Sequence, residues 1–187
     1  MTDLINIINS FQKLDSETEK AIGKYFILEK FNKNALVIEE GKICDKIYFM
    51  VSGAVRRFCI EDGEEVTKWI YTDNQFFTSL SSFFEQKPSF ESFQTCEETI
   101  VYSLSFDDEA KLLEYPLFAK FHIKMLRTFL SKINEFHHLF RTMTAQQKYT
   151  FLLQSFPQII IKAKQKHIAS LINVSPETLS RIRSSIT

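Results

Sequence analysis

Glycine and proline are scarce in this chain of 187 residues, with four of each. Long disordered linkers are rich in such residues, so the sequence argues against them. No apolar run approaches the roughly 20 residues that a membrane-spanning helix needs. The N-terminal segment MTDLINIINSF carries an acidic residue and none of the basic residues that open a signal peptide. These absences predict a cytoplasmic protein with no membrane partner.

The residue patterns of metal and redox sites are also absent from the sequence. The three cysteines, Cys44, Cys59 and Cys96, lie far apart, and there is no CxxC pair or cluster of cysteine and histidine. This pattern predicts reduced, mostly buried thiols rather than a zinc or iron–sulfur site. There are four histidines, and no Ser/His/Asp triad, paired catalytic carboxylates or P-loop. We therefore expect no enzyme, no catalytic residues, no metal and no cofactor.

Net charge is absent too, because 23 basic residues balance 23 acidic residues. The basic and acidic residues are nevertheless distributed unevenly along the chain. From residue 145 to residue 187, six lysines and arginines stand against Glu177 alone, which is a formal charge of +5. The remaining chain therefore carries −5. A basic segment of this kind is typical of a phosphate-binding surface in a nucleic-acid-binding protein.

The segment Gln165 to Ser184, QKHIASLINVSPETLSRIRS, predicts two short helices around a tight turn. Apolar residues recur at helical spacing on both sides of the turn, at Ile168, Ala169, Ile172, Leu179 and Ile182. Asn173 tolerates the left-handed backbone that the turn needs, and Ser175 and Pro176 favour the cap and first position of a helix. We expect a helix-turn-helix whose second helix is Pro176 to Ser185. An ordinary helical hairpin at the end of a domain remains the alternative.

The region from about residue 27 to residue 104 has the composition of short strands. Six pieces are rich in β-branched and aromatic residues: FILEKF, ALVIEE, KIYFMVSG, AVRRFCIE, VTKWIY and TIVYSLS. Turn glycines separate them, which predicts an antiparallel sandwich or barrel. Its interior is expected to take Val37, Ile47, Phe49, Val51, Val55, Trp69, Ile70, Val101 and Leu104. Residues 73–99 interrupt the pattern with a short helix, a loop and another strand, and such a segment is often used for binding.

A long helix is predicted from about Pro116 to Thr142. Its apolar residues are spaced 3, 4, 3, 4 and 3, at Leu126, Phe129, Ile133, Phe136, Phe140 and Met143. This spacing is that of a coiled-coil seam, so we expect a parallel homodimer with these six residues at the dimer interface. The alternative is a helix buried within one monomer.

A β-roll, a long dimer helix and a C-terminal helix-turn-helix, in this order, resemble the CRP/FNR superfamily of bacterial transcriptional regulators. The resemblance covers nearly the whole chain and is most specific in IASLINVSPETLSRIR, with glycines in VIEEGK and FMVSGAVR matching β-roll turns. It implies an α+β fold with an antiparallel double-stranded β-helix of the cyclic-nucleotide-binding-like jelly-roll kind. The implied domains are residues 1–115 for the β-roll with N-terminal helices, 116–143 for the dimerisation helix, and 144–187 for a helix-turn-helix domain lacking a full wing.

The resemblance also implies a partner, double-stranded DNA, and the residues that contact it. The base-reading positions of the family fall on Glu177 and Arg181. The phosphate-contacting positions fall on Gln165, Lys166, Ser175 and Thr178. The chemistry fits these roles, because Glu can accept from cytosine N4 and Arg can donate two bonds to guanine O6 and N7. Glu177 and Arg181 are also four residues apart, so a simple surface ion pair is an alternative. If the protein is an activator, RNA polymerase is a further partner.

The chain departs from the family where cyclic nucleotides bind. Members that bind them have a Gly-Glu pair and an Arg-Ser pair, which fall here on Phe77-Thr78 and about Ser89-Phe90. A phosphate without a cation in a half-buried pocket would be poorly compensated, so we expect no cyclic AMP binding. Residues Phe76, Phe77, Thr78, Ser89 and Phe90 could instead line an apolar effector pocket for an unidentified small molecule, or the space could simply be filled.

Two functions therefore remain open. The first is a homodimeric DNA-binding transcriptional regulator that does not respond to cyclic AMP. The second is a small-molecule sensor with a ligand pocket in the β-roll and weak or lost DNA binding. Affinity for duplex DNA that falls steeply with salt would distinguish the first from the second.

Overall fold

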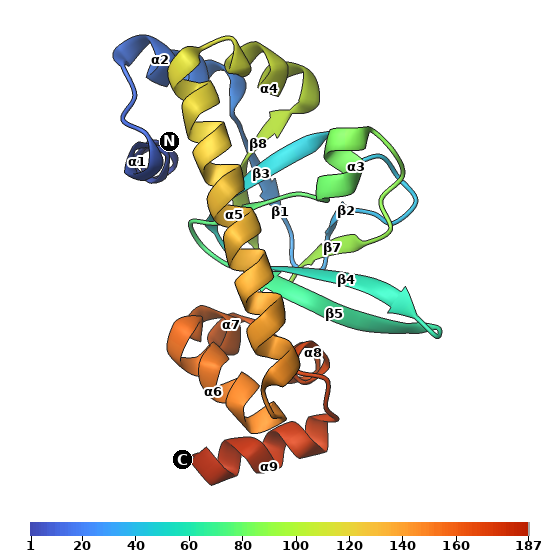
Figure 1. Ribbon diagram of the computed structural model, residues 1–187. Coiled ribbons are helices and arrows are strands. Elements are labelled where there is room, and N and C mark those ends of the chain that lie inside the picture. The colour runs from blue at the N-terminus through green and yellow to red at the C-terminus, as the bar shows by residue number, and fades with distance from the viewer. Residues whose placement is uncertain (187) are drawn as a thin grey trace.

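The computed structural model describes residues 1–186. It has three parts along the chain: an N-terminal β-roll with flanking helices, one long helix, and a group of four C-terminal helices (Figure 1). Two short helices come first, α1 (Thr2–Phe11) and α2 (Ser16–Tyr25). Asp15 begins α2 as its cap, because its side chain accepts a hydrogen bond from the Thr18 amide. The predicted α+β class is confirmed.

Eight strands form two antiparallel four-stranded sheets that enclose the β-roll. One sheet has the order β1-β8-β3-β6 and the other the order β2-β7-β4-β5. The strands are β1 (Ile27–Phe31), β2 (Leu36–Ile38), β3 (Lys46–Ser52), β4 (Val55–Glu61), β5 (Glu64–Tyr71), β6 (Phe76–Phe77), β7 (Ser92–Thr95) and β8 (Thr99–Ser105). Asp62 and Gly63 join β4 to β5 with φ angles of 51° and 83°, as a tight hairpin turn requires.

The space between the sheets is filled with aromatic and aliphatic side chains. Tyr48 stacks on Phe77 with ring centroids 5.1 Å apart, and Phe77, Tyr71 and Phe93 continue the stack. Val55 and Val101 lie in this interior, as predicted. The prediction was wrong for Phe49, Val51 and Leu104, which pack outside the first sheet, and for Ile70, which packs against the C-terminal helices. The sheets are buried on both faces, so alternation of apolar and polar residues cannot identify the inner face.

Helices cover the outer face of the first sheet. Phe49 and Leu104 pack there against α1, α2, α4 (Phe106–Leu113) and the start of α5 (Pro116–Thr142). The helix α5 has 27 residues and matches its predicted bounds, and Pro116 occupies its first turn, where the missing N–H costs nothing. A short helix, α3 (Leu80–Glu85), lies between β6 and β7.

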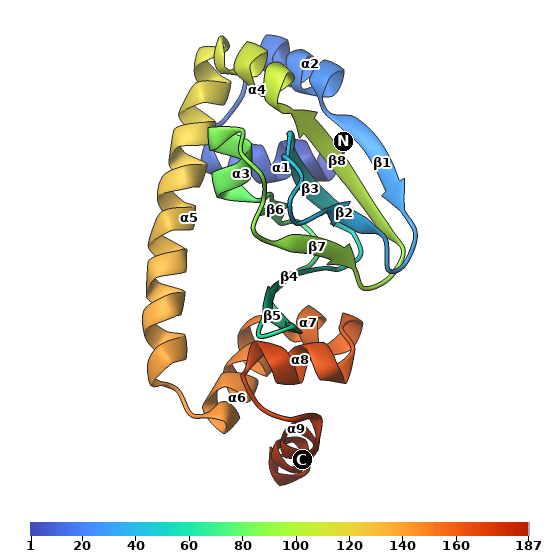
Figure 2. The ribbon, with the colours of Figure 1, turned by 90° about the vertical axis from the view of Figure 1, so that its right-hand side faces the viewer.

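The C-terminal helices are α6 (Ala145–Ser155), α7 (Pro157–Lys162), α8 (Gln165–Leu171) and α9 (Pro176–Ile186). Their core continues into the second sheet, because Ala54, Ile70 and Cys96 pack against Ile159 and Ile168. The helical group therefore rests on the β4–β5 hairpin of its own chain, as the second view shows (Figure 2). In the described part of the chain, no helix is both long and apolar enough to span a bilayer.

Candidate nucleic-acid interface

The turn between α8 and α9 is built as the sequence predicts. Asn173 adopts a φ of 61°, the left-handed conformation that asparagine tolerates. The Val174 amide donates to the Ala169 carbonyl at 3.0 Å and closes the end of α8. The Thr178 amide then donates to the Ser175 hydroxyl at 3.2 Å, so Ser175 caps α9. These local bonds hold α9 at a set angle to α8.

The helix α9 has one apolar face and one exposed polar face. Leu179 is fully buried, and Ile182 and Ile186 are half-buried against the helical core. Glu177 and Arg181, one turn apart, are exposed on the other side together with Thr178. In both views α9 lies at the far end of the molecule from the N-terminal helices (Figures 1 and 2). The polar face of α9 is therefore not covered by the β-roll of the same chain.

The surroundings of Glu177 favour its ionised form. The Ser175 hydroxyl holds the pKa of Glu177 below its ordinary value, and the positive charge of Arg181 lowers it further. Gln165 and Lys166 are exposed in the first turn of α8, next to α9 in the same unit. The six predicted DNA-contacting residues therefore all belong to the α8–α9 unit.

The five residues predicted for an effector pocket lie in different surroundings. Phe77 belongs to the aromatic stack of the interior, whereas Phe76 packs outward on Phe49, with centroids 5.0 Å apart. Ser89 is buried and donates to the Glu91 carbonyl, and the Thr78 hydroxyl donates to the Lys46 carbonyl. Phe90 is 63% exposed. Phe76, Phe77 and Thr78 line one apolar groove, whereas Ser89 and Phe90 are not among its lining residues.

A partly buried ion pair inside the β-roll was missed by sequence reasoning. Arg57 on β4 places its Nε atom 3.5 Å from Oε2 of Glu91, in the loop before β7. Burial raises the pKa of Glu91, and the Arg57 guanidinium opposes that rise. The signal in the sequence was the pair Arg56-Arg57 within a strand, because adjacent residues of a strand point to opposite faces. One arginine of such a pair has to point inward.

An apolar groove of about 50 Å³ lies between α5 and the β6–α3 segment. Its walls from α5 are Met125, Leu126 and Phe129, so two of the six predicted dimer residues line it. The wall from the opposite side includes Phe76 and Phe84. Leu126 and Phe129 therefore face the β-roll at least in part.

The other predicted dimer residues divide between two environments. Phe136 packs on Trp69 of the same chain with ring centroids 4.7 Å apart, and Phe140 stacks on Phe136 at 4.4 Å. Ile133 and Met143 are half-buried. The strongly exposed apolar residues of α5 are Ile123 at 50% and Leu130 at 63%, which the predicted seam omitted.

The β-roll is similar to a domain of known proteins. Residues 28–115 match the sequence model of the cyclic nucleotide-binding domain. This match covers the β-roll and α4, which together are just under half of the chain. Among curated proteins, no sequence matches this chain significantly.

Solved structures extend the likeness beyond that domain. The catabolite activator protein of Thermus thermophilus is 20% identical and covers 94% of this chain and 85% of its own, with a TM-score of 0.59. FixK2 of Bradyrhizobium japonicum is 17% identical, covering 86% and 84%, with a TM-score of 0.70. A CooA mutant from Carboxydothermus hydrogenoformans is 16% identical, covering 98% and 83%, with a TM-score of 0.69. The chain therefore has the fold of the CRP/FNR regulators, and the predicted resemblance is confirmed at that level.

Proposed function

We propose that this protein is a DNA-binding transcriptional regulator of the CRP/FNR type that binds operator DNA as a homodimer. The observation that carries the proposal is the exposed polar face of α9, which presents Glu177 and Arg181 on a segment with a formal charge of +5. A duplex needs such a surface, because cations must replace the counterions of the phosphates. The structural relatives that span most of this chain include an activator protein and regulators.

In the proposed complex, α9 enters the major groove. Arg181 donates two hydrogen bonds to a guanine edge, and Glu177 accepts from cytosine N4. Lys166 and Gln165, in the first turn of α8, contact the phosphate backbone, as do the hydroxyls of Ser175 and Thr178. The residues from 144 onward form the DNA-binding domain in this proposal, residues 1–115 the effector-binding-like domain, and residues 116–143 the dimerisation helix.

The dimer forms along α5, but on a face shifted from the predicted seam. This face carries apolar residues at the heptad spacing of the predicted seam, with intervals of 3, 4 and 3 between Ile123, Leu126, Leu130 and Ile133. Two of them are the strongly exposed residues of the helix, whereas Phe136 and Phe140 are engaged in their own chain. An exposed apolar stripe on a long helix is stabilised when a second copy covers it. A parallel pair of α5 helices would carry two copies of α9 to successive major grooves.

Cyclic AMP is not the effector in this proposal. Ser89, which is buried, occupies about the place of the family's phosphate-binding arginine, and the half-buried Arg57 is already paired with Glu91. The aromatic stack occupies the interior. The apolar groove beside α5 favours a small apolar effector if the protein is instead a sensor with weak or lost DNA binding. With this regulatory role we also propose a cytoplasmic location. If the protein is an activator, it contacts RNA polymerase.

The test is selection of duplexes from a random-sequence library, followed by titration of the selected duplex at several salt concentrations. We expect affinity to fall steeply as salt rises, with a slope of about −0.9 per phosphate contact on a logarithmic plot. Lys20→Ala, which removes an exposed cation from α2 at the opposite end, is the control and should leave the slope unchanged. Failure to enrich any duplex, or a slope near zero, would leave the sensor as the better explanation.

A further inference from the structure

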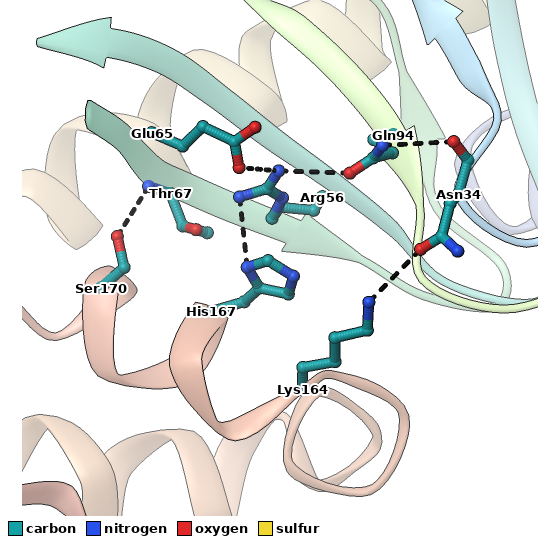
Figure 3. A network of polar contacts seen from close by, with 8 residues as sticks. All are labelled: Asn34, Arg56, Glu65, Thr67, Gln94, Lys164, His167 and Ser170. Carbon is teal, nitrogen blue, oxygen red and sulfur yellow. Dashed lines mark hydrogen bonds and ion pairs between the residues drawn. The ribbon is translucent and has the colours of Figure 1, made fainter. Parts of the chain in front are cut away.

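Arg56 on β4 is a buried arginine at the junction between the β-roll and the C-terminal helices. Its side chain is 2% exposed, and three elements contact it (Figure 3). Nη2 donates to Glu65 on β5 at 2.6 Å and to Gln94 on β7 at 3.2 Å. Nη1 lies 3.1 Å from Nδ1 of His167 on α8, and the guanidinium lies 4.0 Å above the Phe58 ring.

The contact between Arg56 and His167 requires a neutral imidazole. A guanidinium has only donors, so Nδ1 of His167 must accept the hydrogen bond and the proton must lie on Nε2. A protonated His167 would direct an N–H group at a buried cation. The other charges that face His167 are Lys164 and Lys166 from α8 and its cap, and Glu65 from β5. Three cations and one carboxylate therefore surround this ring.

Further polar contacts join the same two parts of the chain. The Thr67 amide on β5 donates to the Ser170 hydroxyl on α8 at 2.9 Å. Lys162 on α7 donates to Asp73 at 2.7 Å and to the Gly53 carbonyl at 3.1 Å. The turn after α8 is closed by backbone bonds, so α8 and α9 move together. The docking of α8 on the sheet consequently sets the position of α9.

We propose that Arg56 and His167 form a latch that holds α8, and with it α9, on the β4–β5 hairpin, and that protonation of His167 in mild acid opens it. The opened state keeps both parts folded but separates the helical group from the second sheet. This device needs no DNA and goes beyond the regulatory role proposed above.

The direction of the pH effect follows from linkage. Burial, followed by Arg56, Lys166 and Lys164, lowers the pKa of His167 from 6.5 to about 4, and Glu65 opposes them only in part. Well above pH 6.5 the ring is neutral in both states, so the latch has its full strength. Between 6.5 and about 4 the opened state binds a proton that the closed state rejects, which weakens docking. At pH 5.5 the docking constant should be roughly tenfold lower than at neutral pH.

Trp69 provides the measurement, because it is the single tryptophan of the chain and lies at this junction. Its ring packs on Phe136 at 4.7 Å and on Phe156, between α6 and α7, at 5.1 Å. Opening the latch would expose it to water. We expect its emission to shift to the red and acrylamide quenching to rise between pH 7.5 and 5, with unchanged far-ultraviolet circular dichroism.

Three variants separate the latch from general acid effects. His167→Gln keeps a neutral acceptor for Arg56 and should leave Trp69 shielded at both pH values. His138→Gln removes an exposed histidine of α5 and should titrate like the wild type. His167→Lys places a permanent cation against Arg56 and should increase quenching already at pH 7.5.

Two results would overturn the latch: wild-type quenching that stays constant from pH 7.5 to 5, or a His167→Gln variant that titrates like the wild type. The comparison of wild type with His167→Gln decides the matter even if His167→Lys does not fold. Since the assay contains no DNA, its outcome is separate from the test of DNA binding.

Discussion

At the scale of single residues, Arg181 and Lys166 carry the same charge but offer different chemistry. The planar guanidinium of Arg181 can make two parallel hydrogen bonds to one base, whereas the ammonium of Lys166 acts as a point charge. Both are exposed in the α8–α9 unit, so removing either side chain leaves the helical core intact. Their replacement should therefore affect different properties of the proposed DNA complex.

We predict that Arg181→Ala relaxes sequence preference at one base pair by roughly 5- to 150-fold, from about 1–3 kcal/mol of lost discrimination. Lys166→Ala should weaken binding to all duplexes alike and reduce the salt slope by about 1. Competition titrations with single-base variants of the selected duplex measure both effects. Unchanged base preference in Arg181→Ala would refute its assignment as a base-reading residue.

At the scale of elements, α5 shows how one apolar pattern can serve two partners. The predicted seam and the exposed stripe share Leu126 and Ile133, and they differ by a rotation of the helix. The C-terminal part of the predicted seam turns toward Trp69 and α6, so Phe136 belongs to the core of one chain. The exposed stripe with Ile123 and Leu130 is covered by a second copy in the proposed dimer.

This division predicts opposite results for two substitutions on the same helix. Leu130→Asp should leave the folded monomer intact and break the dimer, because a carboxylate in an apolar seam is poorly solvated. Phe136→Ala should destabilise the chain by about 1–3 kcal/mol, since its half-buried ring contacts Trp69 and Phe140. Analytical ultracentrifugation and urea unfolding distinguish the two effects. A Leu130→Asp protein that remains dimeric would place the interface elsewhere.

At the scale of the whole molecule, charge and packing separate the two ends. The C-terminal segment carries +5 and the rest −5, so in the proposed DNA complex the acidic part would repel the phosphates and favour approach by α9. The β-roll is similar in sequence to the cyclic nucleotide-binding domain, and within it Arg57 is paired with Glu91. In the proposed reading, Arg57 is therefore not free to bind a cyclic phosphate.

Calorimetric titration with cyclic AMP should accordingly show no binding at micromolar concentrations. A cyclic phosphate would need to displace Glu91 from Arg57 within a filled interior, and both changes oppose binding. Glu91→Gln is a useful companion variant, since it frees the guanidinium without changing side-chain size. Micromolar binding by the wild type would contradict this part of the proposal.

Local chemistry made some features predictable. The turn at Asn173, the cap at Ser175 and the start of α5 at Pro116 each depend on a few neighbouring residues, and all three match the structure. The separate helix α7 was not predicted, although Pro157 begins it after α6. Its apolar run PQIIIK is too short for a period to be recognised.

The sequence alone determined the order of the elements, the turn before α9 and the charge of its exposed face, because these depend on contacts within a few residues. Only the tertiary structure decided that Arg56 is buried against His167, that Arg57 pairs with Glu91, and that Phe136 belongs to its own chain. Those partners are separated by 111, 34 and 67 positions along the chain. Such pairings arise from the packing of sheets and helices, and no local pattern of residues specifies which distant side chain will fill a given space.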